Sequence, residues 1–120
     1  MREAAMRAPK TNAVLEVAPS IGTEAVFVCA ERQLQMLAKA NNLWIPEVTR
    51  RDSAAATLET GHYEDDNVTG FRIRLHHRAA AGKVDVELKG AGAYFIDLGV
   101  DTAIADFRRE LSRCLDQGNG

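Results

Sequence analysis

Two adjacent segments of the chain alternate strictly between apolar and polar residues. They span residues 69–77 and 84–89. Their apolar positions are Phe71, Ile73, Leu75, Val84, Val86 and Leu88. A period of two is typical of β-strands that bury one face and leave the other in solvent. Because the four residues 79–82 connect the segments, we expect an antiparallel hairpin.

The register of this hairpin follows from aligning its two apolar faces. This alignment places Leu75 opposite Val86 and Ile73 opposite Leu88. On the solvated face it predicts two cross-strand pairs, which are Arg74 with Glu87 and, when the histidine is protonated, His76 with Asp85. Opposite charges directly across a strand pair contribute about 0.2–1 kcal/mol each, so they reinforce this register.

The N-terminal half predicts one strand and one helix before the hairpin. Residues 13–18 are expected to form a strand that Pro19 ends, because proline cannot donate to the ladder. A helix then runs to about Asn41, with Thr23 as its N-cap. Alternatively, this helix starts only near Ala30, because residues 24–30 include Val and Phe, which favour strands. Its apolar face comprises Phe27, Ala30, Leu34, Leu37 and Ala38. Residues 54–63 are a weaker strand candidate, or a short helix.

The C-terminal part predicts a third strand and a second helix. Residues 94–100 are expected to continue the sheet, with Tyr94, Ile96, Leu98 and Val100 on the buried face. Asp101 then caps a helix to about Asp116. The apolar stripe of that helix comprises Ile104, Phe107, Leu111 and either Cys114 or Leu115.

Together these elements predict an α+β fold. It is an antiparallel β-meander of three to five strands, with one helix before and one helix after its main hairpin, both packed on the apolar sheet face. We expect a single domain at residues 13–116, a mobile N-terminal leader at 1–12 and a frayed tail at 117–120. A chain of 120 residues can bury roughly two-thirds of its unfolded surface, which suffices for one core.

Composition excludes several classes of protein. The formal net charge is −2, which does not indicate nucleic-acid binding, and the longest apolar run, residues 25–30, is too short to span a membrane. The two cysteines, Cys29 and Cys114, do not form a disulfide framework, which favours buried free thiols in a cytoplasmic protein. The glycines at 90 and 92 do not open a helix, so no nucleotide cofactor is expected.

One row of polar side chains has the composition of a metal or acid–base site. The predicted register aligns His76, Asp85 and Asp97 across the solvated face. A histidine with two carboxylates can bind a divalent cation or transfer protons. A solvated ladder of paired charges accounts for the same residues, and we expect this ladder and no bound metal.

Two hypotheses of function follow. The favoured one is a non-catalytic protein-interaction module that forms a homodimer or higher homo-oligomer, through a sheet edge or through an exposed aromatic on the solvated face. The residues of that face are Phe95, Arg72, Arg74 and Glu87. The alternative is a small-molecule-binding protein or modest enzyme, with an apolar ligand in a cleft between helix and sheet. The cleft would be lined by Trp44, Phe71, Tyr94 and Phe107, with Tyr63 and His77 as polar groups.

Overall fold

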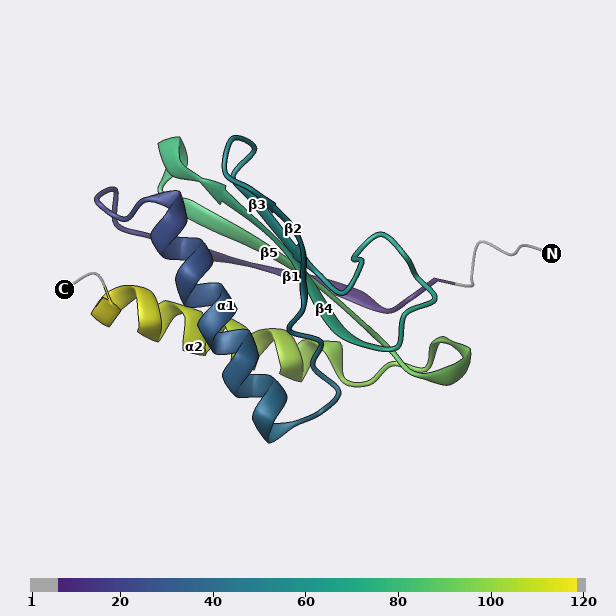
Figure 1. The fold of residues 1–120 in the computed structure, drawn as a ribbon. Helices are drawn as coiled ribbons and strands as arrows, with labels where there is room; N and C mark the ends of the chain where they lie inside the picture. The colour runs from purple at the N-terminus through teal and green to yellow at the C-terminus, as the bar shows by residue number, and fades with distance from the viewer. Residues whose placement is uncertain (1–6, 119–120) are drawn as a thin grey trace.

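The computed structural model describes residues 7–118 and contains one antiparallel sheet with two helices on one face (Figure 1). The strands are β1 (Lys10–Glu16), β2 (Val48–Asp52), β3 (Thr57–Thr60), β4 (Gly70–Arg78) and β5 (Lys83–Ala91). The helices are α1 (Thr23–Ala40) and α2 (Val100–Gly118). The strand order is β1-β5-β4-β3-β2, and every neighbouring pair is antiparallel. The predicted α+β class and the placement of the helices are confirmed.

The main hairpin has the predicted register. Leu75 pairs with Val86, Ile73 with Leu88, and on the opposite face Arg74 pairs with Glu87 and His76 with Asp85. The connection is a short 3-10 turn that ends at Gly82, whose φ of 64° lies in the left-handed region that favours glycine. Apolar matching and turn geometry were therefore sufficient to align these two strands.

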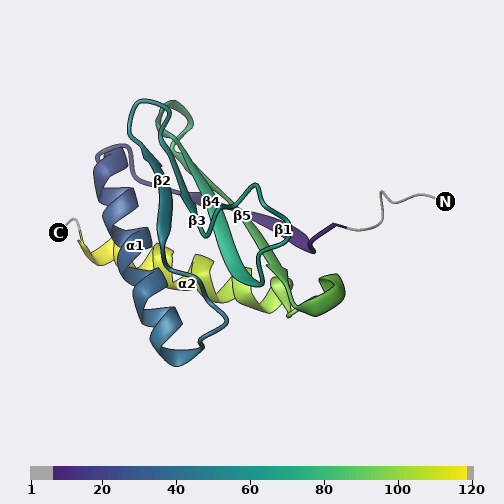
Figure 2. The same ribbon diagram turned by 45° about the vertical axis from the view of Figure 1, so that its right-hand side comes forward.

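The core fills the space between the sheet and both helices, which lie on the same side of it in Figure 2. The predicted helix faces are the ones that contact it. In α1 they are Phe27, Ala30 and Leu34, with Leu37 and Ala38 partly buried; in α2 they are Ile104, Phe107, Leu111, Cys114 and Leu115. Helix α1 begins at Thr23, after Gly22 as N-cap, so residues 24–30 are helical. Their burial against the sheet outweighs the strand preference of Val and Phe.

The N-terminal strand begins earlier than predicted. Lys10 already pairs with Lys89 of β5, so residues 10–12 belong to β1 and not to a leader. At the other end, α2 continues through 117 and 118, which were expected in the tail. The remaining parts of the predicted leader and tail, residues 1–6 and 119–120, lie outside the described residues.

Strand β2 was not predicted, and the weak candidate at residues 54–63 contains only the four residues of β3. Residues 53–56 form the turn between these strands. The sequence of β2, VTRRD, lacks apolar alternation because this strand lies at the sheet edge and buries little. Its pairing with β3 also contains a bulge between Val48 and Arg50.

The predicted third strand at residues 94–100 is wrong. Strand β1 lies beside β5 as far as Lys89, and residues 93–95 form a 3-10 turn. Of the predicted pairing only an isolated antiparallel bridge between Ala91 and Asp97 is present. Tyr94 and Ile96, expected in the core, are 90% and 61% exposed. The helix cap is also different: the Oδ1 atom of Asp97 accepts hydrogen bonds from the backbone N–H groups of Gly99 and Val100, at 2.8 and 3.0 Å.

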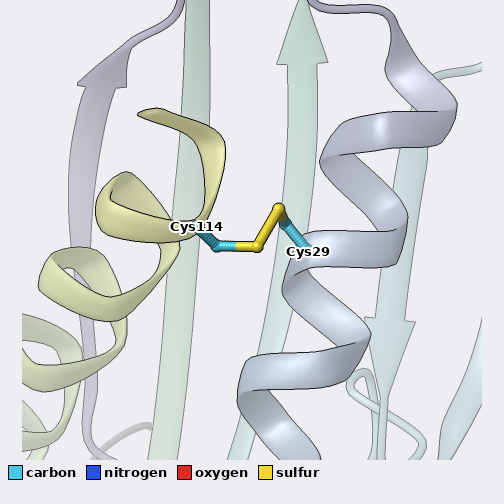
Figure 3. Close-up of a disulfide and its surroundings, with 2 residues drawn as sticks. All are labelled: Cys29 and Cys114. Carbon is cyan, nitrogen blue, oxygen red and sulfur yellow. A yellow bond between two sulfur atoms is a disulfide. The ribbon is translucent and has the colours of Figure 1, made fainter. Parts of the chain in front are cut away.

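A disulfide joins the two helices. Cys29 of α1 and Cys114 of α2 are bonded across the helix pair, with their Cα atoms 5.8 Å apart (Figure 3). The expectation of free thiols is therefore wrong. The two residues are 85 positions apart, and only the packing of both helices on one sheet face brings them together.

Candidate functional site

The sheet face opposite the helices carries a network of ion pairs. Arg74 is at its centre, where its guanidinium lies 2.8 Å from Glu59 and 4.0 Å from Glu87 and also contacts Glu64. The predicted Arg74–Glu87 pair is thus present as one part of a larger network. Lys10 also contacts Glu87 and Arg50 contacts Glu59, so three cations face three carboxylates and little net charge is left to attract a charged ligand.

The predicted polar row does not assemble into a three-residue group. His76 and Asp85 are cross-strand neighbours, but Arg78 donates to the Asp85 carboxylate at 2.9 Å and is the main reason that the pKa of Asp85 is lowered. Asp97 lies in the loop before α2. Among residues 7–118, no group of three or more His, Cys, Asp and Glu side chains is arranged to hold a metal ion.

The segment 61–69, which we call the cover segment, folds over part of this charged face. Its Tyr63 is 1% exposed, and two cations lie over its ring, with the Arg74 guanidinium carbon 4.8 Å and Lys89 Nζ 4.5 Å from the ring centroid. The Tyr63 hydroxyl donates to Glu87 at 3.2 Å. Burial first, and the adjacent Glu87 second, raise the pKa of Tyr63, so this phenol stays protonated. Tyr63 is therefore a packing residue, on the opposite side of the sheet from the predicted cleft.

Arg72 lies beneath the cover segment and is completely buried. Its Nη1 atom is within hydrogen-bond distance of four backbone carbonyls of residues 61–65, and the shortest contact is 2.7 Å to Asp65. Burial lowers the pKa of Arg72. Gly61 is required at this close approach, because a Cβ there would lie 2.6 Å from Arg72 Cγ. Arg72 therefore organises a loop and is not available at an interface.

The six residues of the predicted cleft lie in four separate places. Trp44, Phe71 and Phe107 pack against one another in the core, with ring centroids 5.1 Å (Trp44–Phe71) and 6.3 Å (Trp44–Phe107) apart. His77 of β4 is buried beside the first residue of α1, and its Nδ1 lies 2.8 Å from Thr23 Oγ1. Tyr63 and Tyr94 lie outside this core. The aromatic rings thus fill the space in which an apolar ligand was expected.

A surface hollow of about 470 Å³ lies beside the cover segment. It is lined by Thr49, Arg50, Glu59 and residues 62–65. Its one well-buried carboxylate, Glu59, is engaged by Arg74 at 2.8 Å and Arg50 at 3.4 Å. The buried carboxylate of the hollow is therefore already neutralised by two guanidinium groups.

The loop between β5 and α2, residues 92–99, has the most unusual backbone of the described chain. Tyr94 and Phe95 are consecutive non-glycine residues with φ values of 58° and 62°. The left-handed conformation costs an L-residue about 1–2 kcal/mol. The loop is held by hydrogen bonds from Gly92 N–H to the Ile96 carbonyl at 2.7 Å and from Phe95 N–H to the Gly92 carbonyl at 3.1 Å. It is thus a strained but well-defined structure.

This loop presents apolar side chains to solvent beside a small groove. Tyr94 and Ile96 are exposed, whereas Phe95 is half-buried and lies here and not on the sheet face. The groove, of about 150 Å³, lies between residues 66–69 and 92–95. The sequence signalled an unpartnered aromatic but assigned it to Phe95, because alternation was extended through a segment that is not a strand. We take the loop 92–99 and this groove as the candidate site.

None of the helices within residues 7–118 is both long and apolar enough to cross a bilayer. Comparisons of the chain with models of protein families, with curated proteins and with solved structures found no match, so the candidate site is defined by its own geometry alone.

Proposed function

We propose that this chain is a non-catalytic protein-interaction module that acts as a homo-oligomer, and that its contact surface is the loop 92–99. The observation that carries the proposal is the left-handed backbone conformation of the consecutive residues Tyr94 and Phe95. In this conformation the Tyr94 side chain is 90% exposed. Backbone strain of this kind is found preferentially at functional sites. Exposed aromatic residues are enriched at the centres of protein interfaces.

The other surfaces considered for self-association are less suitable. The open edge of β1 is partly blocked, because Arg108 Nε donates to the Val14 carbonyl at 3.1 Å. The open edge of β2 carries a bulge and the charged residues Arg50, Arg51 and Asp52. Bulges and charges are features by which native proteins prevent edge-to-edge pairing. The sheet face is occupied by its own ion pairs and by the cover segment.

The disulfide bears on where such a module works. The expectation of a cytoplasmic location rested in part on the absence of a disulfide framework, and the Cys29–Cys114 bond weakens that part of the reasoning. Disulfides persist in oxidising compartments and are rare in the cytosol. We therefore extend the proposal to an oxidising compartment.

The experiment is a measurement of solution mass by sedimentation over a concentration series. The wild-type chain is expected to show a mass above the 13.1 kDa of one copy, increasing with concentration. Tyr94→Ser is expected to shift it towards the monomer. Met36→Ser is the matched control, because Met36 is also exposed, at 60%, but lies on α1. A wild-type chain that stays monomeric at every concentration, or a Tyr94→Ser variant that associates like wild type, would contradict the proposal.

A further inference from the structure

We infer that two copies of this chain meet across a two-fold axis beside Tyr94, each inserting its Tyr94 into the groove of the other copy between residues 66–69 and 92–95. This inference rests on the function proposed above and names its partner and geometry. Its starting point is that a projecting side chain and a hollow lie next to each other on one surface: Tyr94 is 90% exposed and is also one wall of the groove.

A projection directly beside a hollow makes a patch that can be complementary to itself across a two-fold axis. In such a contact the same patch is used by both partners, so residue i of one copy contacts residue j of the other and the reverse. Rotation about an axis between Tyr94 and the groove superposes each tyrosine on the partner's groove. The contact closes after two copies, because both projections and both grooves are then occupied.

The groove suits the side chain that would enter it. Its volume of about 150 Å³ is on the scale of a single side chain and well below that of a pocket for a drug-sized ligand. Val68 provides an apolar surface for the ring, whereas Asn67 and Thr69 provide polar groups for the phenolic hydroxyl. Tyrosine, with an apolar ring and a polar tip, matches both parts of this lining.

The charges beside the two halves of the patch are complementary. On the groove side, Asp66 of the lining pairs with Lys89 at 2.8 Å, and the pKa of Asp66 is lowered by Lys89 mainly, with smaller contributions from Arg72 and Arg7. Of these cations, Arg7 is exposed. On the side of the projection, the exposed Asp97 directly follows Ile96. A two-fold rotation brings the groove side of one copy to the projection side of the other, and therefore brings Arg7 towards the partner's acidic side.

The loop 92–99 is also preorganised for binding. Hydrogen bonds within residues 92–96 and the Asp97 cap hold it in one conformation, so little conformational entropy is lost on association. The patch is small, which places the contact among weak or transient interfaces and not among permanent dimers.

Photo-crosslinking tests this arrangement directly. Tyr94 is replaced by p-benzoylphenylalanine, and equal amounts of isotopically labelled and unlabelled chains are mixed, irradiated and analysed by mass spectrometry. We expect crosslinked species that stop at two copies and join position 94 of one copy to residues 66–69 or 92–95 of the other. The same photoreactive residue at position 36 is the control and is expected to give no such crosslink.

A second variant fills the groove without altering the projection. Asn67→Trp is expected to weaken self-association about tenfold or more, the scale of a lost aromatic anchor. Its circular dichroism spectrum reports whether the fold is retained, and if it is not, the crosslinks alone decide. Crosslinked ladders beyond two copies, or crosslinks to a different surface, would overturn the two-fold arrangement and leave the proposed function intact. A monomer that forms no intermolecular crosslink would overturn both.

Discussion

Removal of the Cys29–Cys114 disulfide should cost a large part of the stability of this domain. The bond closes a loop that spans 85 residues and contains all of β2 to β5. In the chain-entropy model, closing a loop of this length restrains the unfolded chain by about 4–5 kcal/mol at 25 °C. Domains are stable by only about 5–15 kcal/mol in total. We therefore expect the double variant Cys29→Ala/Cys114→Ala to lose about 4–5 kcal/mol of unfolding free energy.

Urea unfolding followed by circular dichroism measures this loss. With a slope of about 2 kcal/mol/M, the urea midpoint should fall by roughly 2–2.5 M, while the slope itself increases because the unfolded chain is less compact. Wild-type protein treated with reductant should show the same fall, and the double variant should not respond to reductant. A double variant whose midpoint lies within about 0.5 M of wild type would refute the reasoning. It would mean that the bond does not form or does not restrain the unfolded chain.

Three further predictions concern single residues. Tyr94→Asn should raise the midpoint temperature of thermal unfolding, because asparagine tolerates the left-handed conformation and relieves strain of about 1 kcal/mol. Self-association of this variant should be lost. A lower midpoint temperature would argue against backbone strain at Tyr94. Arg72→Met should lower the unfolding free energy by about 2–4 kcal/mol in urea unfolding, because several carbonyls of residues 61–65 lose their buried hydrogen-bond donor. An unchanged urea midpoint would mean that Arg72 does not stabilise the cover segment. Stability should fall as the pH drops below 6.5, because burial first, and His76 second, lower the pKa of His77 in the folded state, so that the unfolded chain binds more protons. The variant His77→Gln should flatten this pH dependence of stability. An equally steep dependence in that variant would mean that other groups cause it.

The parts of the fold that depend on local pattern were predicted well. In β4 and β5 the two faces of each strand differ in polarity, so a shift by one residue would expose every apolar side chain. Leu75 and Val86 were paired correctly for that reason. The stripe that includes Phe107 and Leu111 likewise identified α2 and the face that it buries.

The parts that depend on long-range neighbours were not predicted. Alternation at residues 94–100 is compatible with a strand, but an antiparallel partner for β5 was available in β1, about 75 residues earlier in the chain. Arg72 alternates onto the solvated face and is nevertheless buried, because the cover segment folds over it. The cover segment directly precedes β4, but the alternation of apolar and polar residues does not report that such a loop folds back over the following strand. Phe95, which was expected to be exposed on the sheet face, is half-buried in the loop 92–99, and its neighbour Tyr94 is the exposed aromatic.

The class of this fold, its main hairpin and the buried faces of its helices follow from periodicities that each segment carries within itself, so they can be derived from the amino-acid pattern alone. The folded chain is needed to show that Cys29 meets Cys114, that β1 and not residues 94–100 completes the sheet, and that Tyr94 is exposed beside a groove. Each of these depends on segments far apart in the chain, whose pairing is selected by the free energy of the whole core and not by any one segment.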